Sequence, residues 1–382
     1  MATRILFLHH TAIIGGAELH LLSVARRFRE SSIVVLFTDG CFRHVLETAG
    51  VRVVVLPSEW AARGVRRQGP RFSVANVTSV VRLAWLAAKA ASDADLIYAN
   101  SPKALLVASV ARLVRRKPVI WFLHDLLDET HFSSRTIRLL VAVANRTAAR
   151  ILANSKATAA AFVSAGGRGD LVQVVYDGFD AAPFTDTSVD LSALRGELSP
   201  PGLRVVGVFG RITPWKGQDV VLRALVNVPS LIAVFVGEEE DPASGAELRL
   251  LTRELGIAER VRFLGFRKDV PQLMRVVDCI VHVPIAPEPF GRVVVEGMLA
   301  GRPMIATRAG GVPEIIENGV SGILITPGSP DELAEALRRV FSDPVAAAAM
   351  AANGQARALA CFSDKRMLRE IEQHVSEISV AS

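Results

Sequence analysis

The sequence predicts an α/β protein that contains two doubly wound, Rossmann-like parallel sheets. Short β-branched runs alternate with longer amphipathic runs, which is typical of parallel strands covered by helices. This alternation occurs once up to Val175 and again from Leu203, and 382 residues suffice for two or three domains. Half of the residues are hydrophobic and only 21% are charged, which excludes a disordered chain.

The apolar runs define the expected strands and domains. Strands are expected in the first half at 4–8, 32–37, 51–56, 95–99, 118–122, 150–153 and 171–175, and in the second half at 203–209, 231–236, 261–263, 278–282, 303–306 and 322–325. The segment 176–202 is rich in Asp, Ser, Pro and Gly and fits a connection between a domain at 1–184 and a domain at 203–363. A helix expected at 364–378, within the final segment 364–382, could cap the second domain or return to the first.

Hydropathy and cysteine usage favour a cytoplasmic protein. No run of about 18 uncharged apolar residues occurs, and the apolar stretch at the N-terminus is too short for a signal peptide. The three cysteines, Cys41, Cys279 and Cys361, are scattered and odd in number, which argues against a disulfide framework and a zinc site.

Charge is distributed unevenly along the chain. Residues 1–184 carry 23 Lys and Arg against 13 Asp and Glu, whereas the remainder carries 21 against 25. A basic half could face nucleic acid, an anionic membrane or a phosphorylated substrate. Its arginine-rich pieces, 66–67 and 115–117, have no interleaved aromatic residues, so nucleic acid is not an expected partner.

Two glycines follow the first expected strand. Gly15 and Gly16 precede a helix, where bare backbone N–H groups favour phosphate, although such a pair can also be ordinary punctuation between strand and helix. The segment lacks the G-x-G-x-x-G fingerprint and the acidic residue that a dinucleotide site requires. A nicotinamide enzyme is therefore disfavoured.

A second segment places two cations at the start of the second domain. In VVGVFGRITPWKGQDVVL, Arg211 ends a strand and Lys216 begins a helix, so both are expected at the carboxyl edge of the sheet. The planar fork of Arg and the point charge of Lys together suit a diphosphate, although a pair of solvated surface charges is an alternative. The Walker lysine pattern is absent, which disfavours P-loop ATP hydrolysis.

The segment PIAPEPFGRVVVEGMLAGRPMIATRAGGVPEII is the most informative. Glu288 lies in a proline-rich loop, Phe290 and Gly291 are expected to open a helix, and Glu296 is expected about two turns along it. Eight helical residues span about 12 Å, which is comparable to the distance between the sugar and the ribose of a nucleotide sugar. Each glutamate alone could be a structural ion pair or a loop carboxylate, but their spacing favours a shared ligand.

Together these segments resemble the retaining nucleotide-sugar glycosyltransferases of family 4, which have the GT-B fold. The resemblance rests on the E-x7-E arrangement in EPFGRVVVE, on GRITPWKG, on the GG-A-E loop and on GGVPEII, and it covers nearly the whole chain. It implies two domains that face each other across a cleft, with the acceptor on the first and the donor on the second. It also implies that the C-terminal helix crosses back to the first domain.

The resemblance assigns roles to particular residues. Arg211 and Lys216 would hold the diphosphate, Glu288 the donor sugar and Glu296 the ribose, while Gly16 would approach the phosphate from the first domain. Phe266 and Arg267, in FLGFRKD, fall at the family's base-binding edge. The helix start completes the expected donor site with Phe290, Gly291, Arg292 and Val293.

His124 completes the expected catalytic set with Arg211, Lys216 and Glu288. It follows a strand in VIWFLHDLLDE and matches the family's cleft histidine. A lone histidine is more often a satisfied loop residue, but the position at a strand's carboxyl end and the family match favour the site. Asp125 could orient it. His9 and His10 are also expected at the edge of the cleft, and these histidines form no metal-ligand set.

The expected reaction is transfer of a hexosyl group from a UDP- or GDP-linked sugar to an acceptor hydroxyl, with the anomeric configuration kept. Fixed cations and helix N–H groups would stabilise the departing diphosphate, so we expect no metal and no cofactor besides the donor substrate. Two alternatives remain, a nucleotide-sugar-binding subunit without transfer activity and a GT-B nucleotide-sugar epimerase.

The acceptor is left open between a glycan, a lipid-linked sugar and a small molecule. The residues Trp60, Arg63, Arg66, Arg67, Arg71 and Trp85 could press on an anionic membrane and place the protein on its inner face. A solvated basic surface and a pocket for an acidic small molecule are equally compatible with them.

Overall fold

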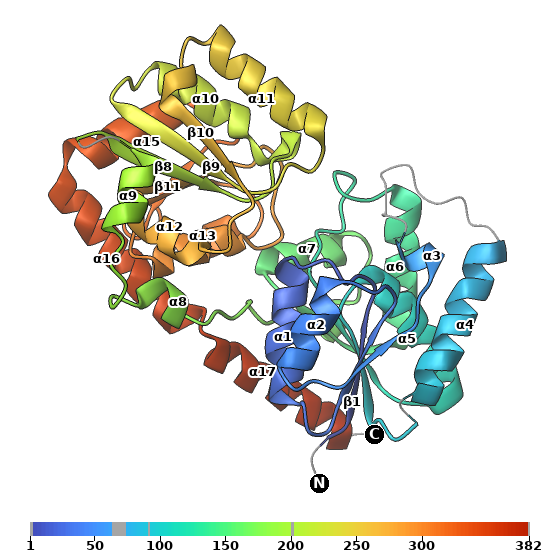
Figure 1. The fold of residues 1–382 in the computed structure, drawn as a ribbon. Coiled ribbons are helices and arrows are strands. Elements are labelled where there is room, and N and C mark those ends of the chain that lie inside the picture. Colours follow the sequence, from blue (N-terminus) through green and yellow to red (C-terminus); the bar gives the residue numbers. More distant parts are fainter. Residues whose placement is uncertain (1–2, 63–73, 91, 200–201, 381–382) are drawn as a thin grey trace. The chain divides into compact units, whose positions relative to one another are not determined.

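The computed structural model describes residues 3–62, 74–90, 92–199 and 202–380 (Figure 1). The chain forms two compact units. Unit 1 comprises Met1–Gly178 and Asp364–Ser382, and unit 2 comprises Phe179–Ser363.

Unit 1 is built on a parallel sheet of seven strands in the order β3-β2-β1-β4-β5-β6-β7. The strands are β1 (Ile5–His9), β2 (Ile33–Leu36), β3 (Val53–Val55), β4 (Leu96–Ala99), β5 (Val119–Leu123), β6 (Ala148–Ala153) and β7 (Val172–Val174). Each overlaps an expected strand. The order changes direction between β1 and β4, and such a switch point is where open parallel sheets bind ligands.

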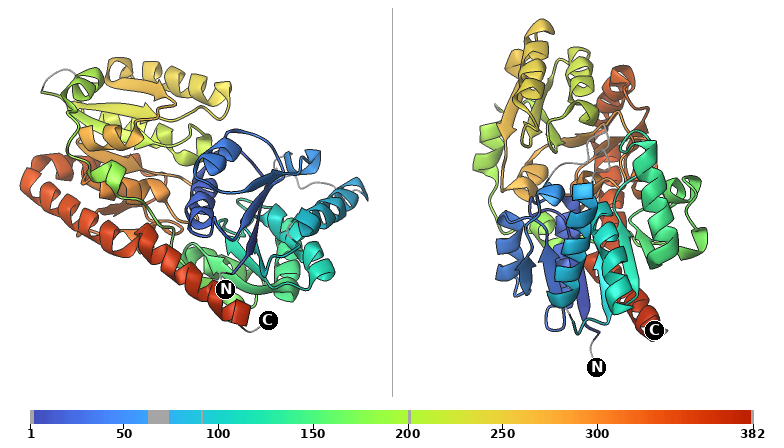
Figure 2. Two further views of the ribbon diagram at one scale, coloured as in Figure 1. Left: turned by 60° about the horizontal axis from the view of Figure 1, so that its bottom comes forward. Right: turned by 90° about the vertical axis from the view of Figure 1, so that its right-hand side faces the viewer.

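Helices cover both faces of this sheet (Figure 2). They are α1 (Gly16–Arg27), α2 (Cys41–Thr48), α3 (Glu59–Ala62), α4 (Val74–Ala90), α5 (Pro102–Arg115), α6 (Ser134–Thr147), α7 (Lys156–Ser164) and α17 (Asp364–Val380), with a 3-10 turn at Gly169–Leu171. Alternate residues of β1 lie on opposite faces of the sheet. Leu6 and Leu8 belong to the core that includes α4, α5 and α6, whereas Ile5 and Phe7 belong to the core that includes α1, α2 and α17.

Unit 2 is built on a parallel sheet of six strands in the order β10-β9-β8-β11-β12-β13. The strands are β8 (Arg204–Phe209), β9 (Leu231–Val236), β10 (Val261–Gly265), β11 (Cys279–His282), β12 (Met304–Thr307) and β13 (Ile323–Ile325). All six overlap expected strands. The switch point lies between β8 and β11.

The helices of unit 2 begin at local signals in the sequence. They are α8 (Ala182–Thr185), α9 (Ser192–Leu198), α10 (Gln218–Val226), α11 (Pro242–Glu254), α12 (Val270–Val276), α13 (Arg292–Leu299), α14 (Val312–Ile315), α15 (Pro330–Ser342) and α16 (Pro344–Cys361), with 3-10 turns at Pro214–Lys216 and Ala258–Arg260. Asp241, Ser329 and Asp343 each accept a hydrogen bond from a first-turn N–H, and a proline follows each of them.

The structure differs from the sequence-based expectation in two segments. The segment 176–202 contains α8 and α9, and from Phe179 onward it belongs to unit 2. Glu288 lies in a loop as expected, and the helix expected to open at Phe290 and Gly291 begins at Arg292, so the eight residues from Glu288 to Glu296 are not helical throughout and Glu296 is not two turns along the helix. Pro289 precedes it, and Gly291 has a φ of 113°, a left-handed conformation that ends the loop rather than continuing a helix. Glu296 is thus about one turn into α13.

None of the helices in the described residues combines the length and apolar composition that crossing a membrane requires.

Candidate active site

A buried carboxylate lies between two basic side chains at the carboxyl edge of unit 2's sheet. His282, the last residue of β11, approaches Oε2 of Glu288 with its Nε2 at 2.6 Å. Lys216, in the 3-10 turn after β8, donates to Oε1 of the same carboxylate. Because β8 and β11 are neighbours at the switch point, two segments separated by more than 60 residues meet there.

The two basic partners keep Glu288 ionised. Burial acts to raise the pKa of Glu288, but the charges and hydrogen bonds of His282 and Lys216 hold it well below its usual range. The ammonium of Lys216 also lies 4.3 Å from the ring centroid of Trp215, a cation–π contact that restricts its position. The result is a fixed carboxylate and a fixed cation side by side, of which only 8% and 15% of the side-chain surfaces are exposed.

The glycines of two motifs shape the backbone around this cluster. Gly310 has a φ of 60°, and a Cβ there would overlap the carbonyl oxygen of Glu288. The N–H of Gly311 donates to that same oxygen at 2.9 Å. Gly217 has a φ of 70°, and a Cβ there would overlap the carbonyl oxygen of Val283. The glycines of WKG and GGVP are therefore needed for close backbone packing around Glu288.

The other predicted donor residues lie just before α13 and in its first turn. Phe290 is buried and packs against Phe179 and Phe362, with ring centroids 6.3 Å and 5.7 Å away. The guanidinium of Arg292 lies 4.2 Å from the ring centroid of Phe179, and its Nη2 is 3.8 Å from Oε1 of Glu296. Gly291 forms the N-cap and Val293 is half-buried on the first turn.

Glu296 differs electrostatically from Glu288. Burial raises the pKa of Glu296, and the charges of Arg292 and His282 oppose this shift without reversing it. The charges of Arg292 and His282 thus act on Glu296 without a close ion pair, whereas Lys216 and His282 both pair closely with Glu288.

Three other predicted residues of unit 2 do not join the Lys216–Glu288 cluster. The side chain of Arg211 is 64% exposed and lies 3.6 Å from Glu240. Phe266, just after β10, is 70% exposed. Arg267 forms ion pairs with Asp269 and Glu197 at 2.7 Å each, and its hydrogen bonds to them raise its pKa. Through these two ion pairs, the guanidinium of Arg267 holds the loop between β10 and α12 in place.

In unit 1, polar side chains gather where the central strands end. His9 ends β1, and its Nε2 lies 2.5 Å from Oε1 of Glu18 in α1. Asn100 directly follows β4, and its side-chain oxygen lies 3.0 Å from Nε2 of His124, which directly follows β5. Asn154 follows β6 and donates to the carbonyl oxygen of His124 at 3.5 Å. Gly16, the predicted phosphate contact, is the first residue of α1.

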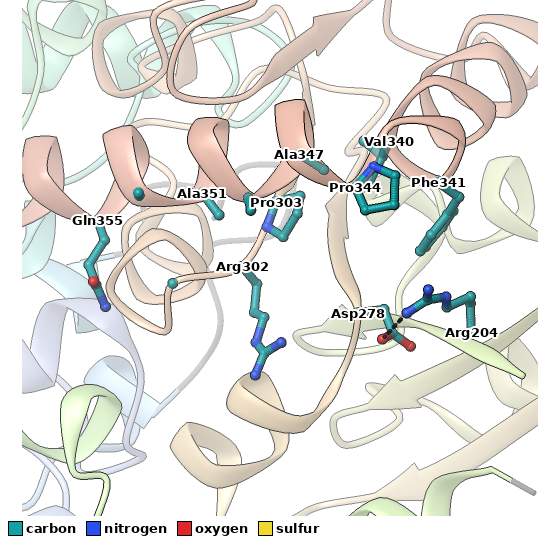
Figure 3. Close-up of a pocket in the computed structure, with 13 residues that line it drawn as sticks. Arg204, Asp278, Arg302, Pro303, Val340, Phe341, Pro344, Ala347, Ala351 and Gln355 are labelled. Atoms are coloured by element: carbon teal, nitrogen blue, oxygen red, sulfur yellow. Dashed lines mark hydrogen bonds and ion pairs between the residues drawn. The ribbon is translucent and has the colours of Figure 1, made fainter. Parts of the chain in front are cut away.

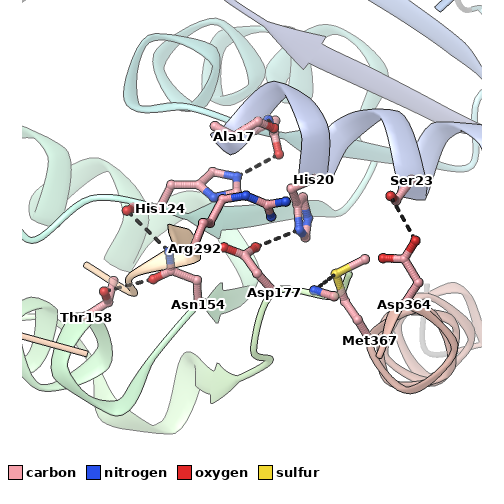
Figure 4. A network of polar contacts seen from close by, with 12 residues as sticks. Ala17, His20, Ser23, His124, Asn154, Thr158, Asp177, Arg292, Asp364 and Met367 are labelled. Carbon is pink, nitrogen blue, oxygen red and sulfur yellow. Dashed lines mark hydrogen bonds and ion pairs between the residues drawn. The ribbon is translucent and has the colours of Figure 1, made fainter. Parts of the chain in front are cut away.

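A second buried histidine lies beside His124 (Figure 4). His20 of α1 contacts the carboxylate of Asp177 with Nδ1 and the hydroxyl of Tyr98 with Nε2, both at 3.1 Å. Its ring lies edge-on to that of His124, with centroids 4.9 Å apart. The side chains of His20 and Asp177 are almost completely buried.

Two residues near this cluster have shifted protonation equilibria. Burial raises the pKa of Asp125 to about 6, with Glu18 adding to the shift and His131 and His9 opposing it. Burial, together with the charges of His9 and Lys103, lowers the pKa of His10 to about 3, so His10 is neutral near pH 7. Within the described residues, no cluster of three or more His, Cys, Asp or Glu side chains is arranged to hold a metal ion.

Sequence reasoning missed His20, Asn100, Asp177 and His282. Two of them could have been found, because Asn100 and His282 stand at the carboxyl ends of expected strands next to a switch point. His20 and Asp177 are brought together over 157 positions, and nothing local in the sequence marks them as a pair.

A pocket of about 360 Å³ occurs elsewhere in unit 2 (Figure 3). It is lined by Arg204, Asp278, Arg302 and alanines of α16, and it lies at the starts of β8, β11 and β12. Ligands of such sheets bind at the opposite, carboxyl ends of the strands. This pocket is therefore separate from the candidate active site.

The fold and the two clusters define a glycosyltransferase of the GT-B type. Residues 14–182 match the family model described as Glycosyltransferase Family 4, and residues 193–357 match the model described as Glycosyl transferases group 1. The crystal structure of Anabaena Alr3699/HepE in complex with UDP and glucose is 39% identical, with a TM-score of 0.89, over 98% of this chain and 99% of that chain. The chain belongs to glycosyltransferase family 4.

Two further relatives show how far the likeness extends. The D-inositol 3-phosphate glycosyltransferase of Mycolicibacterium gilvum (strain PYR-GCK) is 40% identical over 179 residues, which are 45% of this chain and 40% of that relative's length. WaaG, a glycosyltransferase involved in lipopolysaccharide biosynthesis, has a TM-score of 0.73 at 16% identity over 98% of this chain and 99% of that chain, which shows a shared fold.

Proposed function

We propose that the protein transfers a hexosyl group from a nucleotide diphosphate sugar to an acceptor hydroxyl and keeps the anomeric configuration. The observation that carries this proposal is the cluster of Lys216, Glu288 and His282 at the carboxyl edge of unit 2's sheet. The 39% identical structures in complex with UDP and with UDP-glucose support UDP-glucose as the first donor to test.

The cluster has the groups that the donor's reactive end needs. The ionised carboxylate of Glu288 accepts hydrogen bonds from sugar hydroxyls, and the ammonium of Lys216 beside it meets the diphosphate. In a nucleotide sugar these two parts are covalently adjacent, which agrees with the ion pair between the two side chains. Lys216 and the N-terminus of α13 then stabilise the charge that grows on the leaving diphosphate, in the role of a divalent ion in other phosphate enzymes.

In the proposed reaction the bond between the anomeric carbon and the diphosphate oxygen breaks. The acceptor oxygen bonds to the same face of the sugar, and the acceptor's proton passes to the leaving diphosphate. Arg292 and Glu296 bind the nucleotide part of the donor. Arg292 has a buried Nη1 for which the described residues supply no hydrogen bond. Glu296 accepts hydrogen bonds from the ribose hydroxyls. Arg211, with its exposed guanidinium, is a second contact for the diphosphate.

Unit 1 is proposed to bind the acceptor and to contribute His124 as a catalytic residue. The basic composition of the first half favours an anionic acceptor. Because the curated relatives that match about half of this chain are D-inositol 3-phosphate glycosyltransferases, inositol 3-phosphate is one acceptor to test. Glycans and lipid-linked sugars are the other two classes.

Contact with an anionic membrane is a proposal about the same half of the chain. Arg63, Arg66, Arg67 and Arg71 lie outside the described residues. Trp60 packs against the core of unit 1, whereas Trp85 of α4 is 55% exposed. Co-sedimentation of the full chain with vesicles that contain phosphatidylserine, at low and high salt, tests the contact. Absence of binding at low salt contradicts it.

The test of the transfer reaction separates the proposal from its two alternatives. The protein is incubated with UDP-glucose or GDP-linked sugars, with and without acceptors, and nucleotide release, sugar product and anomeric coupling constants are measured. Acceptor-dependent transfer with retention supports the proposal. Donor binding without turnover supports a silent binding subunit, and conversion of the sugar without acceptor supports an epimerase; either result contradicts transfer. Arg223→Ala, which alters an exposed residue of α10, is the control variant.

A further inference from the structure

The pocket at the starts of β8, β11 and β12 has one apolar wall and one charged wall (Figure 3). The apolar wall is formed where α15 meets α16, by Val340, Phe341, Pro344, Ala347 and Ala351. The charged wall consists of Arg204, Asp278 and Arg302. The volume of about 360 Å³ lies in the range of sites that hold small molecules.

The guanidinium of Arg302 has few partners for a largely buried cation. Its Nη2 donates to the carbonyl oxygen of Arg275 in α12, whereas its Nε is buried and makes no hydrogen bond within the described residues. The nearby carboxylate of Asp278 instead pairs with Arg195 at 2.8 Å and with Arg204 at 3.5 Å. Most of the five N–H donors of Arg302 are therefore unused.

The surroundings of Arg302 make its charge unfavourable. Burial is the main cause that lowers the pKa of Arg302; Asp278 opposes the shift, and the charges of Arg195 and Arg275 add to it. An arginine nevertheless keeps its proton at neutral pH, so the charge cannot be removed by deprotonation. A negative charge in the pocket would balance it.

The charges of this region favour a dianionic ligand. Its four guanidiniums are those of Arg195, Arg204, Arg275 and Arg302. Within the described residues, Asp278 pairs with two of them and Asp186 lies near Arg275, which leaves an excess of about two positive charges. A phosphate monoester carries about −1.5 to −2 charges at pH 7 and matches this excess.

A side-chain amide at the edge of the pocket suits a hydroxylated ligand. Nε2 of Gln355 donates to the carbonyl oxygen of Leu299 at 2.8 Å, which sets the orientation of the amide. Gly301 packs against the same group, since a Cβ there would lie 3.2 Å from Nε2. Oε1 of Gln355 is an acceptor, and a ligand hydroxyl is a donor that it can use.

We propose that this pocket binds a small phosphate monoester of a hydroxylated compound, such as a sugar phosphate. The phosphate lies against Arg302 and Arg204, the carbon skeleton packs on the apolar wall, and a hydroxyl donates to Gln355. The site is at the amino ends of the strands, whereas the Lys216–Glu288 cluster is at their carboxyl ends. The inference does not depend on the proposed transfer activity.

The experiment measures binding of ribose 5-phosphate, inorganic phosphate and ribose to the full chain by calorimetry. Because a phosphate could also bind at Lys216, each titration is done with excess UDP and repeated in Lys216→Ala. Ala348→Phe fills the pocket from an exposed position of α16, and Ala349→Phe is its control, since Ala349 is exposed but does not line the pocket. Arg302→Met removes the cation, and Arg339→Met, at an exposed position of α15, is the matched control.

We expect ribose 5-phosphate to bind the unaltered chain in the presence of UDP, and to bind Lys216→Ala with the same affinity. Inorganic phosphate should bind more weakly, because it lacks the carbon skeleton and the hydroxyls, and ribose should not bind. Ala348→Phe and Arg302→Met should each weaken the binding of ribose 5-phosphate by about tenfold or more. The two control variants should leave it unchanged.

Three results would overturn the inference. The first is no binding of ribose 5-phosphate to the unaltered chain. The second is equal affinity in Ala348→Phe and Ala349→Phe, a comparison that holds even if Arg302→Met does not fold. The third is binding that UDP or Lys216→Ala abolishes, which would place the phosphate at the Lys216–Glu288 cluster. A chain that transfers no sugar would contradict the proposed function but leave these binding results valid.

Discussion

The residues Lys216 and Arg211 share a sequence motif but occupy different surroundings. Lys216 is fixed between Glu288 and the ring of Trp215, whereas Arg211 is largely exposed. A preorganised cation stabilises a developing charge more than a mobile one, because it needs no reorganisation during the reaction. The two cations should therefore contribute unequally.

We expect Lys216→Ala to lower kcat with UDP-glucose by about 100-fold or more, by analogy with the loss of one oxyanion-stabilising donor. Arg211→Ala should lower it by less than Lys216→Ala does. Steady-state kinetics of both variants beside Arg223→Ala would measure this. An equal loss in both variants would show that fixation of Lys216 has no effect on turnover.

Glu288 should make stability depend on pH. Its pKa in the folded protein is lowered, so its ionised form contributes stability that is present above its ordinary pKa of about 4.5 and is lost as the pH falls below that value. Glu288→Gln leaves two basic groups without their charged partner and should lower the free energy of unfolding by about 3 kcal/mol near neutral pH.

Denaturant unfolding of both proteins as a function of pH measures this difference. It should shrink as the pH falls below about 4.5, because Glu288 of the unfolded chain then binds a proton that the folded chain does not yet bind. A difference that stays constant down to the acid limit of folding would mean that the carboxylate is not held by Lys216 and His282.

Single residues were predictable from sequence where a motif or a strand end marks them. Glu288 and Lys216 were found from their motifs, and the contact between them was not, because it depends on the neighbouring positions of β8 and β11 in the sheet. His282 and Asn100 were missed although both end or follow a strand. The rule that polar residues at switch points form sites would have selected them.

At the scale of elements, two glycine loops determine the backbone of the donor site. The GGVP loop before α14 packs so closely on the backbone of Glu288 that a side chain at Gly310 has no room. By contrast, Gly328 has a φ of 72°, and a Cβ there would meet no described atom within 4 Å. Both glycines are left-handed, so comparing them separates the cost of packing from the cost of conformation.

We expect Gly328→Ala to lower the free energy of unfolding by about 1 kcal/mol, because alanine is disfavoured in the left-handed conformation. Gly310→Ala should cost about 1–3 kcal/mol more, because the loop that holds Glu288 must move. It should also weaken UDP-glucose binding, measured by calorimetry. Equal stability and affinity in the two variants would contradict the close packing.

Helix boundaries were less predictable than strands. The thirteen strands found among the described residues all overlap an expected run, because continuous β-branched runs between turn residues are a strong signal of a buried parallel sheet. The helix expected to open at Phe290 and Gly291 begins at Arg292, so Glu296 lies about one turn along α13 and not two. The left-handed conformation of Gly291, which ends the loop, is a property of the fold that the E-x7-E spacing does not show.

At the scale of the whole molecule, the last helix belongs to the first unit. Met367, Ile371, Val375 and Ile378 of α17 recur at helical spacing and are buried in the core that includes α1 and α2. The amphipathic pattern predicted the helix, but not which unit it covers, since an apolar stripe fits any exposed sheet or helix face. The family resemblance, not the pattern, pointed to the first domain.

This arrangement makes the stability of unit 1 depend on the end of the chain. Ile371 is fully buried in the core that also contains Phe7 and Leu21, whereas Leu359 of α16 is 45% exposed. Replacing a buried isoleucine by alanine removes apolar contacts and leaves a cavity, which costs about 2–5 kcal/mol. We therefore expect Ile371→Ala to lower the unfolding temperature of unit 1 and Leu359→Ala to have little effect.

Calorimetry with and without UDP can assign the change to one unit, because a ligand raises the unfolding temperature of the part that binds it. If unit 2 binds UDP, the ligand should raise the unfolding temperature of the unit 2 transition. Ile371→Ala should leave that transition unchanged and lower the unfolding temperature of the other transition, that of unit 1. If the two units instead unfold as one, a single transition would shift under both treatments. A fall confined to the UDP-sensitive transition would contradict the packing of α17 on unit 1, since Ile371 would then stabilise the donor-binding unit.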